Sequence, residues 1–240
     1  MSGDPLDSIP ANLSAVRRRL DAAAHNAGRS TSPRLIAVSK TFPVDAVRRA
    51  AATGQRDFGE NRVQEGLDKI AATTDLGLSW HLIGHLQSNK AKKAAASFQW
   101  IHSIDSADLL RKVDAGAVDA GTTPNVLIQV DLAGEATKFG ADADTARDIV
   151  QAALTCRAAT LRGLMIIPPA VDDPEDARPW FRRLVELRDA LIADGVPAES
   201  LTELSMGMSH DFEVAIAEGA TMIRIGTAIF GGRPPVVPPA

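Results

Sequence analysis

A lysine at the end of a short apolar run is the first residue of this chain that could carry out chemistry. The run is Arg34–Lys40, RLIAVSK, and it is followed by Thr41, Phe42 and Pro43. Its β-branched and apolar residues predict a short buried strand that ends on an amine. Low-dielectric surroundings lower the pKa of an amine, and a neutral amine can attack a carbonyl carbon. Lys40 is therefore a candidate nucleophile, although a lone lysine at a strand end is more often snorkelling or salt-bridged.

Two segments near the other end of the chain have the small residues that an anion site needs. Segment 204–211 reads LSMGMSHD, and segment 221–232 reads TMIRIGTAIFGG. Each begins as an apolar strand and continues into Ser, Gly or Thr, which let backbone N–H groups approach an anion closely. Two such turns at adjacent strand ends would form a phosphate cup. Together with the amine of Lys40, they predict a site for a phosphorylated aldehyde.

Apolar strand-like runs alternate with amphipathic helical runs along the 240 residues. A first helix over 9–26 precedes eight β-then-α units. We expect the strands at 34–39, 56–60, 80–84, 100–103, 125–131, 162–167, 203–206 and 222–225. This count predicts a single α/β domain over 1–240, a (β/α)8 TIM barrel with an extra N-terminal helix. A doubly wound open sheet is the alternative, but no G-x-G-x-x-G follows the first strand.

The predicted barrel explains why residues far apart in the sequence could form one site. In such barrels the ligand lies at the carboxyl ends of the strands, and the loops after strands seven and eight often hold phosphate. Lys40, Ser209, Arg224, Gly226 and Thr227 all fall at or just beyond predicted strand ends. We therefore expect them to meet at one rim of the barrel.

Composition and charge narrow the class of protein. Hydrophobic residues make up 45% and charged residues 23% of the chain, as in ordinary globular proteins. The net charge of −4 argues against a nucleic-acid partner, and no apolar stretch is long enough to span a membrane. No secretion signal is visible, so we expect a cytoplasmic protein.

Cys156, the single cysteine, is expected in a helical run as an inert core residue. We expect 1–8 and 233–240 to be disordered tails.

Six motifs in a fixed order resemble one known family. They are AVSK at 37–40, FGENRVQE at 58–65, WHLIGHLQSNK at 80–90, RGLMIIPP at 162–169, SMGMSHD at 205–211 and IRIGTAIFGG at 223–232. Their combination resembles the YggS/PROSC-like family of pyridoxal phosphate homeostasis proteins. That family is similar in fold to the N-terminal barrel of alanine racemase, a fold type III pyridoxal enzyme. It most often has tyrosine after the asparagine of the GEN motif, where this chain has Arg62.

The resemblance implies a site for pyridoxal 5′-phosphate. Lys40 matches the lysine that forms the aldimine (Schiff base) with this cofactor, and Arg224 matches the arginine at the pyridine nitrogen. The other matching residues are Ser209, Gly226 and Thr227 in the phosphate cup and Asn61 on the cofactor face. An arginine does not give up its proton, so it would keep the pyridine nitrogen unprotonated. The ring would then stabilise carbanions less strongly than a protonated ring does.

Three functions remain open. The favoured one is a cofactor carrier in intracellular pyridoxal phosphate homeostasis, without robust catalysis, that is monomeric and supplies apo enzymes. Alanine racemase takes its second base, a tyrosine, from a separate domain of the partner subunit, and this chain contains no tyrosine. The first alternative is a pyridoxal-phosphate-dependent amino-acid racemase-like enzyme with Lys40 as base. The second is a barrel aldolase that uses Lys40 on a sugar phosphate without a cofactor.

Four further residues keep two interpretations each. His81 and His85 flank a strand end, where packing or hydrogen bonding is favoured over a chemical role, either acid–base chemistry or metal binding. His210 lies beside the predicted phosphate turn and could touch the cofactor or point to solvent. Lys138 follows the fifth strand and could hand over the cofactor or be a plain surface lysine.

Overall fold

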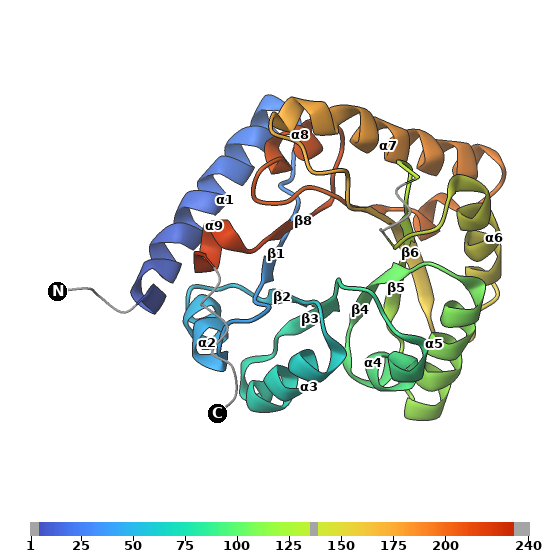
Figure 1. Cartoon of the computed structure of the whole chain (residues 1–240), viewed down its shortest axis with the longest axis horizontal. Helices are drawn as coiled ribbons and strands as arrows, with labels where there is room; N and C mark the ends of the chain where they lie inside the picture. The colour runs from blue at the N-terminus through green and yellow to red at the C-terminus, as the bar shows by residue number, and fades with distance from the viewer. Residues whose placement is uncertain (1–4, 135–138, 233–240) are drawn as a thin grey trace.

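The computed structural model describes residues 5–134 and 139–232 of the chain. Eight parallel strands pair in chain order, and β8 pairs with β1 to close the barrel. Helices between the strands form an outer ring around them (Figure 1). The predicted (β/α)8 barrel with an additional N-terminal helix is therefore confirmed.

The elements follow the predicted order with small shifts at their ends. The strands are β1 Arg34–Val38, β2 Asp57–Glu60, β3 Ser79–Leu82, β4 Trp100–Ile104, β5 Asn125–Val130, β6 Thr160–Ile166, β7 Glu203–Ser205 and β8 Met222–Ile225. The α-helices are α1 Ile9–Asn26, α2 Val44–Ala52, α3 Val63–Ala72, α4 Ala91–Ser97, α5 Ala107–Ala120, α6 Ala143–Ala153, α7 Arg178–Ala193, α8 Phe212–Ala217 and α9 Thr227–Phe230. Short 3-10 helices, labelled η1 to η5, occupy Pro5–Ser8, Thr74–Leu76, Ser88–Lys90, Pro174–Ala177 and Ala198–Ser200.

Two local predictions are wrong. Pro5–Ser8 were expected in a disordered tail, but they form η1 and lead directly into α1. Cys156 was expected within a helical core run, but α6 ends at Ala153 and Cys156 is only half-buried behind it. The predicted tail segments 1–4 and 233–240 lie outside the described residues.

The strands are buried on both faces, as expected for a parallel barrel. Alternate residues point inward, and Ile36, Trp100, Leu127, Met165 and Met222 form an apolar cluster inside the barrel. Their neighbours point outward and join the helices in a larger hydrophobic core. Apolar packing thus holds the strands rigidly, and the loops at their carboxyl ends are presented on a fixed frame.

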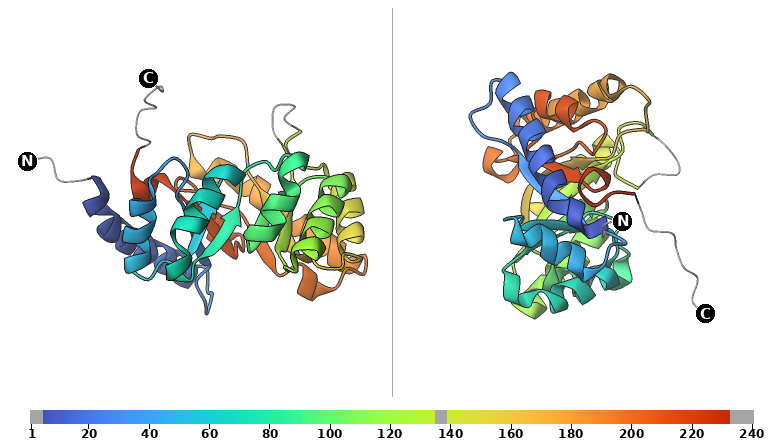
Figure 2. Two further views of the ribbon diagram at one scale, coloured as in Figure 1. Left: turned by 90° about the horizontal axis from the view of Figure 1, so that it is seen from below. Right: turned by 90° about the vertical axis from the view of Figure 1, so that its left-hand side faces the viewer.

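The extra helix α1 covers the seam where the barrel closes. Its buried residues Ile9, Leu13, Val16, Leu20 and Ala24 recur every three or four positions, which is one face of a helix. This face contacts α2, α8 and α9, the helices beside β1 and β8 (Figure 1). In the right-hand view of Figure 2, α1 crosses the outside of the barrel. Within the described part of the chain, no helix combines the length and apolar character of a membrane span.

Candidate cofactor site

All six predicted site residues line a single cavity at the carboxyl ends of the strands. The cavity has a volume of about 310 Å³, and its lining includes Lys40, Asn61, Ser209, Arg224, Gly226 and Thr227. This volume lies at the small end of the range for small-molecule sites. Positions that are far apart in the sequence therefore meet at one rim, because β1, β2 and β8 are neighbours in the closed barrel.

The backbone around Lys40 is held in an unusual conformation. Lys40 follows β1 and is half-buried, and the apolar side chains of Val38 and Phe42 line the cavity beside it. Thr41 has a φ of 68°, which makes it the one residue other than glycine with positive φ in the described ranges 5–134 and 139–232. Such a conformation costs energy and persists only where the surroundings impose it. The Thr41 backbone N–H donates to Glu65 Oε1 at 2.6 Å, which is one such restraint.

A buried ion cluster behind the cavity supplies the other restraints. Lys69 Nζ donates to Glu60 Oε1 at 2.7 Å, to Glu65 Oε1 at 2.9 Å and to the carbonyl oxygen of Ser39 at 2.7 Å. Ser39 Oγ also donates to Glu60 Oε1 at 2.6 Å. Burial raises the pKa of Glu60, although Lys69 and Ser39 favour its charged form. The cluster therefore fixes the residues on both sides of Lys40.

Sequence reasoning did not identify this cluster as part of the site. Two signals could have pointed to it. Glu60 follows Phe58 and Gly59 at the end of a predicted barrel strand, and an acid that is buried in such a place needs a partner. Glu65 and Lys69 are four residues apart in a helix, the spacing at which opposite charges meet.

Arg224 is buried at the inner wall of the cavity, with only 4% of its surface exposed. Its Nη1 donates to Ser205 Oγ at 2.6 Å, and its Nη2 donates to the carbonyl oxygen of Ile166 at 2.8 Å. Burial lowers the pKa of Arg224 to about 10, while Asp211 opposes this shift. The guanidinium therefore stays charged at neutral pH and can act only as a donor.

The turns after β7 and β8 come together at the same cavity. The Ala228 backbone N–H donates to Ser209 Oγ at 3.4 Å, which links the two turns. Asp211 Oδ1 accepts from the Met208 N–H at 2.6 Å and shapes the first turn. Gly207, in that turn, has a φ of 92°, and an added Cβ would lie 2.6 Å from the Ala215 side chain. Both turns thus bring small residues and hydroxyl groups to the cavity, as an anion site requires.

Asn61 directly follows β2 and packs against the loop after β3. A Cβ added to Gly84 would lie 2.3 Å from the carbonyl oxygen of Asn61, so only glycine fits there. This close contact holds the Asn61 backbone at the rim. Arg62, which differs from the family pattern, is exposed and is absent from the lining of the cavity.

The remaining candidates lie in different places. His210 lines the cavity, but its Nε2 bonds the carbonyl oxygen of Asp172 at 3.0 Å. His85 is exposed, lies 3.5 Å from the Asp105 carboxylate and stacks on the Phe139 ring. His81 is fully buried inside the barrel and makes hydrogen bonds there, in line with the favoured interpretation. Lys138 lies outside the described residues.

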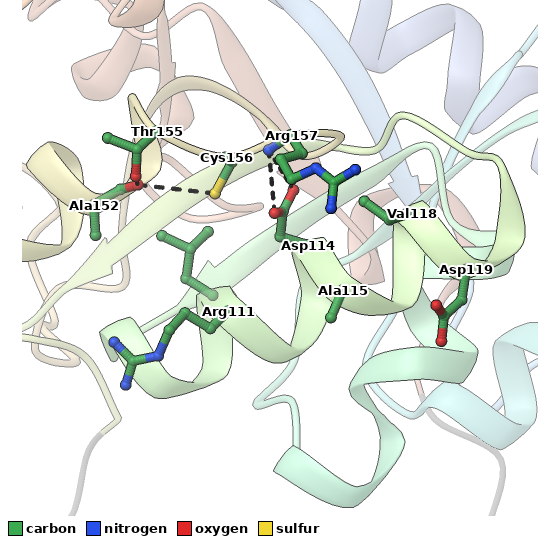
Figure 3. A pocket seen from close by; sticks show the side chains of 10 residues that line it. Arg111, Asp114, Ala115, Val118, Asp119, Ala152, Thr155, Cys156 and Arg157 are labelled. Carbon is green, nitrogen blue, oxygen red and sulfur yellow. Dashed lines mark hydrogen bonds between the residues drawn. The ribbon is translucent and has the colours of Figure 1, made fainter.

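A larger hollow of about 510 Å³ lies on the outer helices, away from the strand ends (Figure 3). It is lined by α5 and by the segment after α6, including Asp114 and Cys156. Asp114 is already satisfied, since its carboxylate accepts from the backbone N–H groups of Arg157, Ala158 and Ala159. Burial raises the pKa of the Cys156 thiol to about 11, so it is protonated and unreactive at neutral pH. The smaller cavity at the rim is therefore the better candidate for a functional site.

Comparison with known proteins identifies relatives over nearly the whole chain. Residues 11–234 match the family model "Alanine racemase, N-terminal domain". The pyridoxal phosphate homeostasis protein of Aquifex aeolicus is 44% identical over 222 residues, which cover 92% of this chain and 96% of that protein. The Escherichia coli protein of the same name is 41% identical and covers 95% of this chain and 98% of its own.

Solved structures agree with these matches. PipY of Synechococcus elongatus with PLP (pyridoxal phosphate) bound superimposes with a TM-score of 0.82 at 42% identity, over 93% of this chain and 100% of PipY. An alanine racemase of Clostridium difficile superimposes with a TM-score of 0.67 at 15% identity and is covered over 56% of its length. At that identity, the racemase shares the fold alone.

Proposed function

This chain belongs to the family of pyridoxal phosphate homeostasis proteins, and from that membership we propose that it binds pyridoxal 5′-phosphate reversibly and supplies it to other proteins. The observation that carries the proposal is the single cavity that is lined by an amine, a guanidinium and two small-residue turns. These groups match the three chemical parts of the cofactor, which are an aldehyde, a pyridine nitrogen and a phosphate. PipY, which is 42% identical, holds PLP.

Lys40 would hold the aldehyde end of the cofactor. Its amine is the group that would form a C=N bond with the aldehyde carbon, with loss of water. The bond is reversible by water, which suits a protein that must release its ligand. The turn from Ser39 to Thr41, fixed by Lys69 and Glu65, keeps the amine at the rim.

Ser209, Gly226 and Thr227 would hold the phosphate, with hydroxyl groups and backbone N–H groups as donors. An added Cβ at Gly226 would lie 3.3 Å from the Val38 carbonyl oxygen, so glycine lets this turn sit close to β1. Asn61 would line the face of the ring. The cavity therefore offers donors for a near-dianion without a lysine or arginine at the phosphate.

Arg224 favours a carrier over an enzyme that stabilises carbanions. A charged guanidinium at the pyridine nitrogen donates to it and leaves it unprotonated, which weakens the ring as an electron sink.

The racemase-like alternative is not favoured, since relatives matching over nearly their full length are named homeostasis proteins. All six proposed ligand residues line one cavity of a single chain, so the proposal needs no second subunit to complete the site. In this proposal the protein works in the cytoplasm and passes its cofactor to apo enzymes that need it.

A titration with pyridoxal 5′-phosphate tests the proposal. The full chain should take up one equivalent and gain a yellow absorption band, and an added apo enzyme should recover activity as the band declines. Lys40→Ala should lose the band, whereas the matched control Lys92→Ala, on the exposed face of α4, should keep it. No band with the natural chain, or an equal band in Lys40→Ala, would overturn the proposal.

A further inference from the structure

A chain of hydrogen bonds crosses the interior of the barrel and ends on Arg224. Asp57 Oδ1 lies 3.0 Å from His81 Nε2, and His81 Nδ1 lies 2.9 Å from His102 Nε2. His102 Nδ1 lies 2.9 Å from Ser205 Oγ, which accepts from Arg224 Nη1 at 2.6 Å. Five side chains from β2, β3, β4, β7 and β8 thus form one continuous path.

This path connects the two opposite ends of the barrel. Asp57 is the first residue of β2 and lies 3.8 Å from Arg34, the first residue of β1, at the amino ends of the strands. Arg224 lines the cavity at the carboxyl ends. The three residues between Asp57 and Arg224 are 0% exposed. Polar groups in such a core are costly unless each one is hydrogen-bonded, and this path satisfies them in sequence.

The two ends of the path fix which atom donates and which accepts in each of its hydrogen bonds. An ionised carboxylate only accepts, so His81 must carry its proton on Nε2, facing Asp57. A neutral His81 then accepts at Nδ1, which requires the proton of His102 on Nε2. The Nδ1 of His102 accepts in turn from the hydroxyl of Ser205. Arg224, which can only donate, completes the series, so every donor points from Arg224 toward Asp57.

The surroundings of both histidines favour their neutral forms. Burial lowers the pKa of His102 well below its ordinary value, and His81, Arg224 and Arg34 lower it further. Burial also lowers the pKa of His81, although Asp57 and Glu203 oppose this shift and Arg34 adds to it. The His81 ring stacks on Trp100 with ring centroids 5.6 Å apart. Neutral rings each supply one donor and one acceptor, as the path requires.

We propose that Ser205, His102, His81 and Asp57 are positioning residues for Arg224. The path orients the guanidinium and offsets part of its charge from the far end of the barrel. The second bond of Arg224, to the carbonyl oxygen of Ile166, fixes the other arm of the guanidinium. The proposal rests on the proposed function only for the ligand that Arg224 faces, which is the pyridine ring of the cofactor.

The first test uses the full chain without cofactor. Nitrogen-15 NMR of histidine-labelled protein distinguishes the two neutral tautomers and the charged ring. His81 and His102 should both be neutral with the proton on Nε2 at neutral pH. A proton on Nδ1 of either ring, or a charged ring, would overturn the proposed direction, whatever the protein does with cofactor.

The second test breaks the path at defined places in the cofactor-loaded protein. His102→Gln keeps a donor toward His81 and loses the acceptor beside Ser205. His102→Asn keeps that acceptor and loses the donor toward His81. Asp57→Asn removes the negative end without touching the cavity. Asp119→Asn, at an exposed position on α5, is the control for the charge change.

The readout is the pH midpoint of the visible absorption band of the bound cofactor. Without the negative end, the site is more positive and binds a proton less readily. Asp57→Asn should therefore lower the midpoint by about half a pH unit or more, and Asp119→Asn should not. Both His102 variants keep the Asp57 carboxylate but interrupt the hydrogen bonds that link it to Arg224, so they should shift the midpoint in the same direction. Normal cofactor uptake with an unchanged midpoint in Asp57→Asn would overturn the proposal. If the natural chain takes up no cofactor, the proposed function fails. The proposed hydrogen-bond path is then tested only by the NMR measurement of the His81 and His102 tautomers.

Discussion

Lys69 Nζ donates to the carbonyl oxygen of Ser39 at 2.7 Å, one residue before the proposed cofactor lysine. The ammonium lies on α3, behind the wall of the cavity, and its side chain is 5% exposed. It is therefore buried beside the Glu60 carboxylate, which is 0% exposed, and it also pairs with the Glu65 carboxylate, which is 26% exposed. This second lysine restrains the residue before Lys40, although it is absent from the lining of the cavity.

Replacing Lys69 should damage both stability and cofactor uptake. Lys69→Met keeps the length of the side chain but leaves Glu60 buried without its counter-ion. We expect a loss of about 3–5 kcal/mol in the free energy of unfolding, measured by urea denaturation. Lys92→Met, at an exposed ion pair, should lose less than about 1 kcal/mol. Adding Glu60→Gln to Lys69→Met should restore part of the loss, and an equally unstable double variant would contradict this account.

The contact between Gly84 and Asn61 should be sensitive to a single methyl group. In Gly84→Ala the new Cβ would overlap the Asn61 carbonyl oxygen, so the loop after β2 must move. We expect about 1–3 kcal/mol of destabilisation and weaker cofactor binding, measured by thermal unfolding and by titration. Gly232→Ala places its Cβ in open space and is the matched control. Equal behaviour of the two variants would show that the contact is unimportant.

The hydroxyl of Ser209 should matter for the phosphate and for nothing else on the cofactor. A hydrogen bond to a charged group contributes about 1.5–3 kcal/mol, so Ser209→Ala should bind pyridoxal 5′-phosphate more weakly by roughly one to two orders of magnitude. Binding of unphosphorylated pyridoxal should stay as in the natural chain. Ser14→Ala, at an exposed position on α1, controls for the substitution itself. Equal losses for both ligands would place Ser209 away from the phosphate.

The buried histidines should make stability depend on pH. Burial lowers the folded-state pKa of His102, so below about pH 6.5 the unfolded chain binds a proton that the folded protein does not. This contribution to stability is fully present above the unfolded pKa and is lost as the pH falls toward the folded pKa. His102→Gln should therefore show a shallower loss of stability in this range, by up to about 1.4 kcal/mol per pH unit.

Urea denaturation across this pH range measures that slope. His25→Gln, at an exposed position on α1, should keep the slope of the natural chain. A slope in His102→Gln equal to that of the natural chain would show that His102 does not stay neutral in the folded protein.

The alternating pattern of the sequence predicts the barrel well, because each strand and helix buries a face that local spacing reveals. Strand β8 and helix α1 have their predicted bounds. That Lys40, Ser209, Arg224, Gly226 and Thr227 line one cavity could be predicted, since they lie at or just beyond strand ends, where barrel topology brings them together. Asn61 was expected there only from the family resemblance. Helix α9 was missed because its four residues are too few to show a helical period.

Interactions that depend on three-dimensional packing could not be predicted in the same way. His81 and His102 lie on adjacent strands, but nothing in their spacing shows that both point inward and meet at 2.9 Å. Ser205, from the far side of the barrel, joins them only because the barrel closes. The positive φ of Thr41 likewise follows from the contacts around it rather than from its own preference.

The most direct test of the central claim is to reduce the cofactor-loaded chain with borohydride and map the modified peptide by mass spectrometry. The reagent fixes a C=N bond permanently, so the label marks the lysine that carries the cofactor. We predict one label per chain, on Lys40, and none in Lys40→Ala. A label on another lysine, or no label in the natural chain, would contradict the account.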